Sequence, residues 1–369
     1  MYTRLKFILV FLFLVSGCYR PYHNPPKIIG NPQRIIGVAE ILSQKETSEI
    51  DLLLIHGMCM HGKDWVAETN NNILNVLNFV EERVVAKDLT PTKIFTNTEL
   101  YSLSFSKNGK TLRTHAIVWS PVTARYKKAL CFDCKDNGCE DNKYCCDGTA
   151  PKYPYKRAYL NNKLKNILVN DCFSDALIYV GIAGEDIKRQ VSEAVTYIAE
   201  KYFTINQNIK NAPIFIISES LGSKILFDVL IQMSKSKRKD IAIRTLRRTM
   251  QVFMGANQIP LLSLAAPPGE KEIGLDSFLK IIRDLKSIVP EKEIQIVSFT
   301  DPNDLLSYPL IGSEQAVDTK IQIVDVIVSN ANTWIGLFEN PLSAHTDYRK
   351  NEDIFKIIVC GFPHSVYCK

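Results

Sequence analysis

The sequence predicts an α/β protein with a mostly parallel central sheet, and three observations lead to this fold class. Short apolar runs alternate with segments of helical periodicity along most of the chain, as in a series of β-α units. The composition is 46% hydrophobic and 23% charged, which suits a sizeable core and excludes wholesale disorder. The elements before and after a cysteine-rich stretch continue one series, so we expect a single large domain over residues 34–369.

The positions of the expected elements follow from the two kinds of periodicity. Apolar or alternating runs predict strands at Arg34–Leu42, Asp51–Ile55, Leu100–Ser106, Lys110–Trp119, Ala176–Val180, Pro213–Ile217, Gln251–Met254, Ile294–Phe299 and Ile321–Val328. Asn108-Gly109 indicates a hairpin between the two alternating runs. Helical periodicity predicts helices at Trp65–Glu81, Lys156–Val169, Gly184–Tyr202, Leu221–Met233, Leu275–Leu285 and Asp353–Val359, and the basic run Ser234–Arg248 is expected to be a solvated helix face.

The first residues are typical of an exported protein. Arg4 and Lys6 precede an apolar stretch that is shorter than the about 20 residues of a transmembrane helix, which indicates a signal peptide over 1–17. Val15-Ser16-Gly17-Cys18 resembles the lipobox of bacterial lipoproteins, which implies that Cys18 is lipidated. We therefore expect a Pro- and Asn-rich tether over 18–33 and a protein anchored to a membrane of the bacterial cell envelope. A secretory peptide cut near Gly17 is the alternative.

The charge balance argues against a nucleic-acid partner. The formal net charge is +6, and removal of Arg4 and Lys6 with the signal peptide would leave +4. Nucleic-acid binding proteins carry a more concentrated basic face. No later stretch has about 18 uninterrupted apolar residues, so we expect no second membrane segment.

Cysteine usage also favours an oxidising compartment. The chain has ten cysteines, and six are candidates for a disulfide-linked insertion over about 125–172: Cys131, Cys134, Cys139, Cys145, Cys146 and Cys172. Cys360 and Cys368 are close enough in sequence to form a bridge, which would leave Cys59 as a free thiol. A zinc site is the alternative for the cluster, because Cys131 and Cys134 have ligand spacing, but the remaining spacing is irregular. We expect no metal and no organic cofactor.

A candidate nucleophile stands between an apolar strand and a helix. Ile214–Phe227 reads IFIISESLGSKILF, so Ser220 would occupy a tight strand-to-helix turn. A serine nucleophile needs small neighbours two positions either side, so that strand and helix can approach each other. The usual pattern is G-x-S-x-G, and here Ser218 replaces the first glycine. Helix capping by Ser218 or Ser220 is the alternative.

Three further stretches supply partners for such a serine. In LLLIHGMCMHGKDW, Met58 follows a strand and His-Gly, so its N–H and that of Leu221 are candidate donors to an oxyanion. His56 is then expected to be structural. His61 is expected to face water, and lining the pocket is the alternative. Asp301 and Asp304 follow another strand, and we favour Asp304 as the acid, with Asp301 bracing the turn. Of the six histidines, only His345 lies between this acid and the last helix.

These four stretches together resemble the α/β-hydrolase family of serine esterases and lipases, over roughly Asp51 to Gly361. The order Ser220, Asp304, His345 is the order of that family's triad. The resemblance implies a three-layer fold and hydrolysis of carboxylic esters through an acyl-enzyme. Its partners would be a small-molecule or lipid ester and, through the N-terminal lipid, a membrane. A non-catalytic surface lipoprotein, an acyltransferase and a thioesterase stay open as alternatives, and the sequence does not indicate an oligomeric state.

Overall fold

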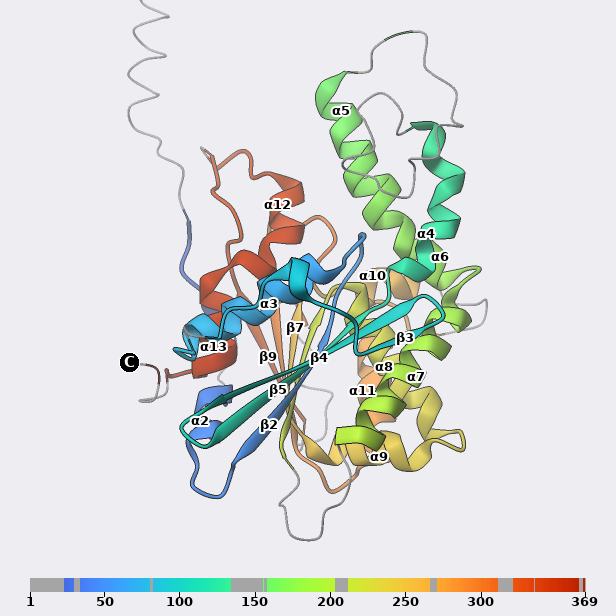
Figure 1. Cartoon of the computed structure of the whole chain (residues 1–369). Helices are drawn as coiled ribbons and strands as arrows, with labels where there is room; N and C mark the ends of the chain where they lie inside the picture. The colour runs from blue at the N-terminus through green and yellow to red at the C-terminus, as the bar shows by residue number, and fades with distance from the viewer. Residues whose placement is uncertain are drawn as a thin grey trace, which may run out of the picture.

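A single mixed sheet forms the centre of the molecule. The computed structural model describes residues 23–29, 34–79, 82–133, 155, 158–202, 212–265, 271–310, 321–334, 336–364 and 368. Within these ranges the strands are β1 (Lys27–Ile29), β2 (Glu49–Ile55), β3 (Lys93–Phe95), β4 (Thr98–Lys107), β5 (Lys110–Val118), β6 (Ile214–Glu219), β7 (Thr249–Gly255), β8 (Ile294–Thr300) and β9 (Ile321–Ile327). They form one nine-stranded sheet in the order β1-β9-β8-β7-β6-β2-β5-β4-β3 (Figure 1).

Most of this sheet is parallel, as the sequence predicts. Strands β9, β8, β7, β6, β2 and β5 are parallel neighbours in turn. The edges are antiparallel: β1 pairs with β9 on one side, and β4 pairs with β5 and β3 on the other. Asn108 and Gly109 both have positive φ, 52° and 75°, and close the β4–β5 hairpin. The mixed α/β class with a mostly parallel sheet is therefore confirmed.

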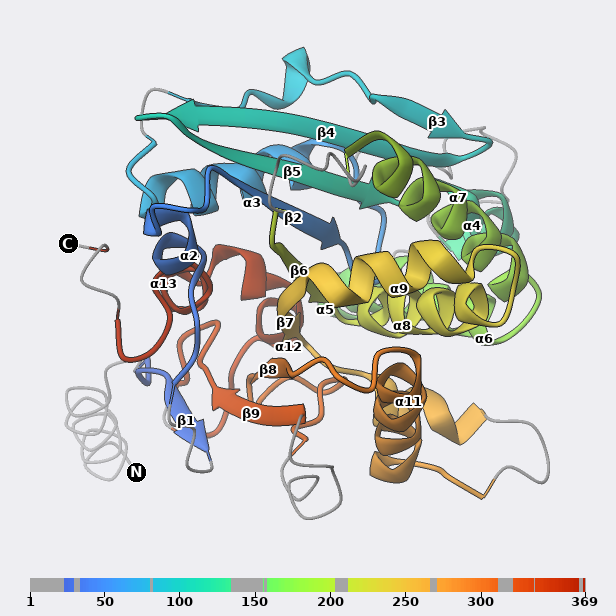
Figure 2. The ribbon, with the colours of Figure 1, turned by 90° about the horizontal axis from the view of Figure 1, so that it is seen from below.

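Helices cover both faces of the sheet (Figure 2). One face packs against α2 (Val38–Ser43), α3 (Lys63–Val76) and α13 (Glu352–Cys360). The other packs against α7 (Gly184–Tyr202), α8 (Leu221–Ser234), α9 (Lys239–Arg248) and α11 (Leu275–Ile288). Because side chains alternate along a strand, Leu52 and Leu54 enter one core and Leu53 and Ile55 the other.

The remaining helices include those at the carboxyl ends of the parallel strands. They are α4 (Pro121–Lys127), α5 (Tyr159–Leu164), the π-helix η5 (Lys165–Phe173), α6 (Ser174–Val180), α10 (Ile259–Leu262) and α12 (Pro341–Thr346), with short turns η1 (Ala86–Asp88), η2 (Lys128–Asp133), η6 (Ser263–Ala265) and η8 (Asp347–Lys350). In Figure 1, α12 and α5 both lie above the sheet. The loops after β2, β6, β7 and β8 meet at one edge, since parallel strands end there together.

Two of the expected strands are wrong. Within Arg34–Leu42 only Ile35 makes a β-bridge, to Phe362, and α2 follows it. Ala176–Val180 belongs to helix α6, in which Ala176 and Tyr179 are buried while Leu177 and Val180 are exposed. A short apolar run does not distinguish a buried strand from a helix, and tertiary packing decides between them.

The other expected strands and helices are present with shifted ends, and several further elements were not expected, among them α10 and α12, which holds His345. β1 lies inside the segment predicted as a tether, β3 adds an edge strand, and α4 follows β5. Most of the cysteine-rich insertion, from Cys134 to Cys146, lies outside the described residues, as does the predicted signal peptide with Cys18.

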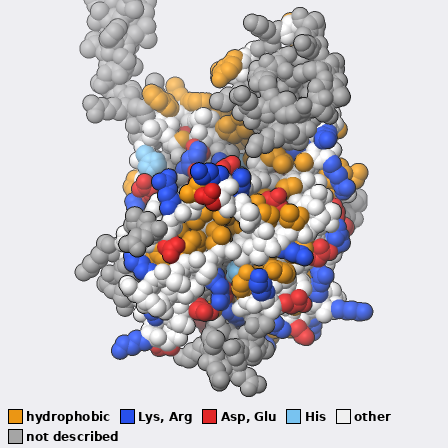
Figure 3. Space-filling model, viewed as in Figure 1, with side chains coloured by type: hydrophobic (Ala, Val, Ile, Leu, Met, Phe, Trp, Pro, Cys, Tyr) orange, Lys and Arg blue, Asp and Glu red, His pale blue; other side chains and the backbone are white. Residues whose placement is uncertain are grey.

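Two properties of the molecule as a whole bear on its surroundings. Among the described residues no single helix is long and apolar enough to cross a membrane, although the bent pair Tyr159–Val180 and Gly184–Tyr202 passes the test of length and composition when counted together. Lys and Arg side chains are interspersed with Asp and Glu on the face shown in Figure 3.

Candidate active site

Ser220 lies in the tight turn between β6 and α8, at the carboxyl end of a central strand. Its φ of 50° and ψ of −125° form a conformation that L-residues rarely adopt. The Ser220 N–H donates a 2.7 Å hydrogen bond to the carbonyl of Gly255 at the end of β7. The fold therefore holds Ser220 in a strained backbone at the apex of a strand-to-helix turn.

The residues on either side of Ser220 explain why the turn differs from G-x-S-x-G. A Cβ on Gly222 would lie 2.3 Å from the His56 carbonyl oxygen, so only glycine allows α8 to approach the loop after β2. At Ser218 there is room for a hydroxyl group. The Ser218 Oγ donates to the Phe253 carbonyl at 3.2 Å and accepts from Ser223 Oγ at 2.9 Å. The serine in place of the first glycine is thus buried with its hydrogen bonds satisfied.

His345 and Asp304, predicted as base and acid, are hydrogen-bonded to each other. The His345 Nδ1 lies 2.9 Å from Asp304 Oδ1 and 3.0 Å from Oδ2, and both side chains are buried. Because a carboxylate only accepts, Nδ1 carries the proton and Nε2 is left as the basic nitrogen. His345 comes from α12 and Asp304 from the loop after β8, so two distant segments build this pair.

Asp301 has a different set of partners. It accepts hydrogen bonds from the backbone N–H groups of Asn303 at 2.9 Å and Asn330 at 2.6 Å. Tyr348 links the two carboxylates: its hydroxyl donates to Asp304 Oδ2 at 3.1 Å and accepts from the Asp301 N–H at 2.8 Å. Burial, followed by the charge of Asp304, raises the pKa of Tyr348 well above its ordinary value, so Tyr348 remains a donor. Asp301 braces the turn that presents Asp304.

Ser220 and His345 line the same small cavity, of about 20 Å³. Gly57, Met58 and Ala256 form other parts of its wall. Ser220 Oγ is buried and has no hydrogen-bond partner in the part of the chain that the structure describes. A catalytic serine often bonds its histidine only loosely before substrate arrives.

The loop after β2 approaches Ser220 with its backbone. A Cβ on Gly57 would lie 2.6 Å from Ser220 Cβ, so glycine permits this contact. The next three amides beyond Met58 are all occupied: Cys59 N–H donates to Asp175 at 2.8 Å, Met60 N–H to Asp171 at 3.2 Å, and His61 N–H to Ser120 at 3.0 Å.

The Met58 N–H differs from those amides, because no described acceptor bonds it. Leu221 is the first residue of α8, so its N–H has no acceptor within the helix. Both residues predicted as oxyanion donors are thus buried and flank Ser220, one in the adjoining loop and one next in the chain.

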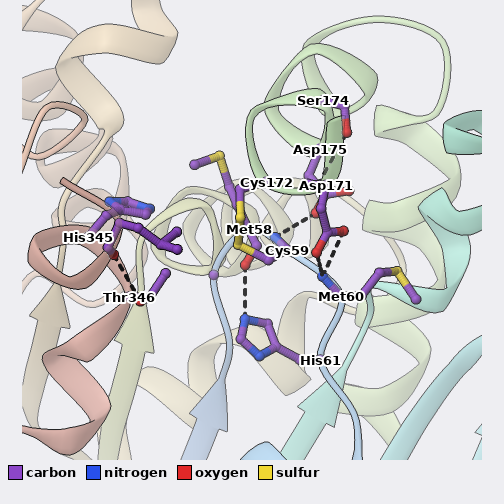
Figure 4. Close-up of a disulfide and its surroundings, with 12 residues drawn as sticks. Met58, Cys59, Met60, His61, Asp171, Cys172, Ser174, Asp175, His345 and Thr346 are labelled. Carbon is purple, nitrogen blue, oxygen red and sulfur yellow. Dashed lines mark hydrogen bonds between the residues drawn. A yellow bond between two sulfur atoms is a disulfide. The ribbon is translucent and has the colours of Figure 1, made fainter. Parts of the chain in front are cut away.

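A disulfide attaches the loop after β2 to the π-helix η5. Cys59 bonds Cys172 of η5, across 113 residues of sequence (Figure 4). The expectation that Cys59 is a free thiol, and Cys172 a partner of the cysteine cluster, is therefore wrong. The second expected bridge, Cys360–Cys368, is present. With Cys18 set aside as the lipidation candidate, five cysteines remain at 131–146, so any unpaired thiol belongs to that cluster.

The acids that bind the loop amides are themselves held by a buried lysine. Lys127 Nζ lies 2.8 Å from Asp171 and 2.9 Å from Asp175, and Lys127 is fully buried. Burial raises the pKa of Asp175 to about 6, while the charge of Lys127 opposes that rise. Cys59, Asp171 and Cys172 are close enough to share a metal ion, but the two sulfurs are joined and Asp171 is bonded to Lys127 and Met60.

The two histidines of the loop have different positions. His56 is structural, as expected: its Nε2 accepts from the Trp119 N–H at 3.0 Å, its Nδ1 donates to the Gly57 carbonyl at 2.7 Å, and its ring stacks on Trp119. Burial lowers the pKa of His56 to about 3. For His61 the favoured expectation, that it faces water, is wrong, and the alternative, that it lines the pocket, holds. Its Nε2 donates to the Met58 carbonyl at 2.9 Å, and the ring lines the cavity that contains Ser220.

Charged residues that the sequence did not single out also face the cavity. Arg349 lies one helical turn beyond His345, and its Nε is 2.9 Å from Glu68. Arg349 lines both the Ser220 cavity and a wider one of about 500 Å³. Burial raises the pKa of Glu219, which precedes Ser220, while Arg349 lowers it. The spacing of Arg349 from His345 is the one sequence signal that could have identified it.

A scan against protein-family models finds no match, and a search of curated proteins finds no similar sequence.

Proposed function

We propose that the protein is a serine hydrolase with an α/β-hydrolase fold that cleaves carboxylic esters. One observation carries the proposal. His345, oriented by Asp304, lines the same cavity as Ser220, which stands on a strained strand-to-helix turn with no competing hydrogen bond among the described residues. The mostly parallel sheet with helices on both faces supports the same class.

In the proposed mechanism, His345 Nε2 accepts the proton of Ser220 Oγ as that oxygen forms a bond to the ester carbonyl carbon. The carbonyl π electrons move to its oxygen, which is stabilised by the Met58 and Leu221 N–H groups. Asp304 stabilises the imidazolium that forms. His345 then gives its proton to the alkoxy oxygen as the C–O bond breaks. Water, deprotonated by His345, attacks the acyl-enzyme and restores Ser220.

Hydrolysis of 4-nitrophenyl acetate and butyrate by the purified mature protein tests this proposal. Ser220→Ala should lower kcat/KM by about 10³-fold or more, because the members of a triad act as a unit. Ser287→Ala, at an exposed serine on α11, is the matched control and should retain wild-type activity. Wild-type turnover in the Ser220 variant would contradict the assignment. A correctly folded wild type without any turnover would favour the non-catalytic lipoprotein.

The same site is compatible with transfer of the acyl group to an alcohol or with thioester cleavage. Acyl transfer differs from hydrolysis only in what attacks the acyl-enzyme, whereas thioester cleavage differs in the group that leaves as the acyl-enzyme forms. Product analysis in the presence of added glycerol distinguishes transfer from hydrolysis: glycerol ester identifies a transferase, and free acid alone identifies a hydrolase.

A further inference from the structure

Three large apolar side chains are exposed together in the loop between β9 and α12. Leu337 is 85% exposed, Phe338 59% and Trp334 53%, and we call these three residues the apolar tip. In Figure 3, apolar side chains gather along the upper edge of the molecule on the side of α12. Single exposed apolar residues are common on soluble proteins, whereas several together indicate a surface that contacts an apolar partner or a membrane.

The backbone of the apolar tip forms a closed turn. The Trp334 N–H donates to the Phe338 carbonyl at 2.8 Å, and the Leu337 N–H donates to the Trp334 carbonyl at 2.9 Å. Gly336 has a φ of 67°, a conformation that favours glycine. Because these polar groups are paired with each other, they can leave water at a lower cost. Tryptophan is also a residue type that is enriched where a bilayer meets water.

The buried carboxylate of Glu339 holds the base of this loop. It accepts hydrogen bonds from Thr333 Oγ1 at 3.0 Å and from Asn303 Nδ2 at 2.6 Å. Asn303 directly precedes Asp304, and α12, which contains His345, begins two residues after Glu339. The apolar tip is therefore attached to both segments that build the His345–Asp304 pair.

The N-terminal segment leaves the sheet at the same end as this loop. β1 is antiparallel to β9, so Lys27, at the start of β1, lies opposite Ile327, the last residue of β9. β9 is parallel to the strands whose carboxyl ends carry the candidate site. The residues before β1 and those after β9 therefore begin at one edge of the sheet, the edge of the candidate site (Figure 1).

His23, the first described residue, lies near the base of the loop. Its Nε2 is 3.9 Å from Asp353 Oδ2 in the first turn of α13, and Asn351, which caps α13, donates to the Ser329 carbonyl at 3.1 Å. The predicted lipidation site, Cys18, is five residues before His23, and at ~3.6 Å per residue the chain between them spans at most about 18 Å. A bilayer that holds a lipid on Cys18 would therefore lie close to the base of the apolar tip.

We propose that the apolar tip inserts into the bilayer to which the N-terminal lipid is attached. The lipid keeps the chain at the membrane, and the apolar tip determines which side of the fold faces the membrane. The loops that carry Asp304 and His345 then lie at the lipid surface. The substrate would accordingly be an ester that resides in the membrane, a consequence that rests on the proposed serine hydrolase function. Insertion itself does not depend on catalysis.

The fluorescence of Trp334 tests the insertion directly. Trp65 and Trp119, the other two tryptophans of the chain, are 3% and 0% exposed, so a quencher inside a bilayer reports on Trp334. The protein is the full mature chain with Cys18→Ser, which removes the site of lipid attachment. It is mixed with vesicles of equal parts phosphatidylethanolamine and phosphatidylglycerol whose acyl chains are brominated. Bromine quenches a tryptophan only at short range, so quenching requires that the ring enters the acyl region.

We expect these vesicles to quench Trp334 and to shift its emission to shorter wavelength. Trp334→Phe should abolish the quenching while the protein still sediments with the vesicles, because the apolar side chain is kept. Leu337→Ser/Phe338→Ser should weaken binding to the vesicles by at least about tenfold, since two exposed apolar side chains no longer leave water. The matched control Ile94→Ser/Ile273→Ser removes side chains that are 55% and 51% exposed elsewhere and should bind as the unsubstituted chain does.

A chain whose Trp334 is not quenched would overturn the proposal, even if the serine variants do not fold. Equal weakening in the Ile94/Ile273 control would overturn it as well, because binding would then be unspecific adsorption. A dimer that Leu337→Ser/Phe338→Ser dissociates, without binding to vesicles, would assign the apolar tip to a second copy of the chain. None of these measurements requires turnover, so a failure here is distinct from a failure of the hydrolase function, which 4-nitrophenyl acetate reports.

Discussion

Asp304 and Asp301 lie three residues apart in one loop and are both buried, but their hydrogen bonds give them different roles. Asp304 is bonded to His345 and Tyr348, while Asp301 is bonded to backbone amides of its own turn and of Asn330. The residue that can offset the charge of an imidazolium is therefore Asp304.

We predict that Asp304→Asn lowers kcat far more than Asp301→Asn. An asparagine at 304 removes the negative charge and can favour the wrong tautomer of His345, which costs up to ~10⁴-fold in serine proteases. Asp301→Asn keeps an acceptor for the turn and should cost at most about tenfold. Ester hydrolysis at pH 7, with circular dichroism to check the fold, provides the measurement. A greater loss in Asp301→Asn would show that the acid is misassigned.

The burial of His56 predicts how stability depends on pH. Its pKa falls from an ordinary 6.5 to about 3 in the folded protein, because burial disfavours the charged form and Nε2 must accept from Trp119. The unfolded chain therefore binds a proton that the folded state excludes, and stability is lost as the pH falls below 6.5 toward 3. Between pH 7 and pH 5 this single group should lower the free energy of unfolding by about 2 kcal/mol.

Urea denaturation at the two pH values tests that effect in wild type and His56→Gln. The variant should be less stable at pH 7. Between pH 7 and pH 5, however, its free energy of unfolding should fall by about 2 kcal/mol less than that of the wild type. Burial also lowers the pKa values of His61 and His115, which adds losses of the same sign. For His61 the charge of His56 is a second cause, which the variant removes. Equal losses of stability in the two proteins would mean that His56 binds a proton in the folded state as readily as in the unfolded state.

The loop after β2 is the element on which the candidate site most depends. Three of its backbone N–H groups donate hydrogen bonds to Asp171, Asp175 and Ser120. The sulfur of Cys59 is bonded to that of Cys172 in η5. Because Met58 lies directly before Cys59, the disulfide fixes the backbone beside a proposed oxyanion donor. The site thus includes a contact between segments that are 113 residues apart.

We predict that the double variant Cys59→Ala/Cys172→Ala keeps the fold but loses about 10- to 100-fold in kcat, since misplacing an oxyanion donor is costly. Treatment of the wild type with dithiothreitol should have a similar effect. The matched control is Cys360→Ala/Cys368→Ala, which removes a bridge at the end of α13 and should leave kcat near wild type. Full activity in the variant without Cys59 and Cys172 would show that Lys127, Asp171 and Asp175 are sufficient to position the loop.

The elements also show which parts of the fold the sequence could predict. Gly184–Tyr202 is a helix over the predicted residues, because its apolar side chains repeat at helical spacing from Ile187 to Ala199. Ala176–Val180 offers only five apolar residues without such a repeat, and packing of α6 against the core decides its structure. The pairing of Cys59 with Cys172 is a property of the folded chain and cannot be deduced from spacing.

At the scale of the whole molecule, residue order was a useful guide to the candidate site. Ser220, Asp304 and His345 were selected by residue type and chain order, and the structure brings Asp304 and His345 into contact and places His345 in the Ser220 cavity. Arg349 was not selected, because its part in the cavity wall and its ion pair with Glu68 are properties of the folded chain. Those properties exist only once the sheet has brought the loops together.

Attachment of the molecule to a membrane is a separate prediction. The lipobox-like Val15-Ser16-Gly17-Cys18 implies that the lipid on Cys18 anchors the mature chain. Cys18→Ser should therefore move the protein from the membrane fraction to the soluble or secreted fraction in a bacterial host. Metabolic labelling with a fatty-acid analogue checks the modification directly. An unlabelled wild type that fractionates like the variant would contradict lipidation.

Covalent labelling by a fluorophosphonate tests the central claim most directly. The reagent phosphonylates a serine that an adjacent base activates, so it reports on Ser220 and His345 without knowledge of the natural substrate. We predict one adduct per chain, located at Ser220 by peptide mass spectrometry, slower to form in Asp304→Asn and absent in Ser220→Ala. A folded protein that forms no adduct, or forms it at another serine, would contradict the account.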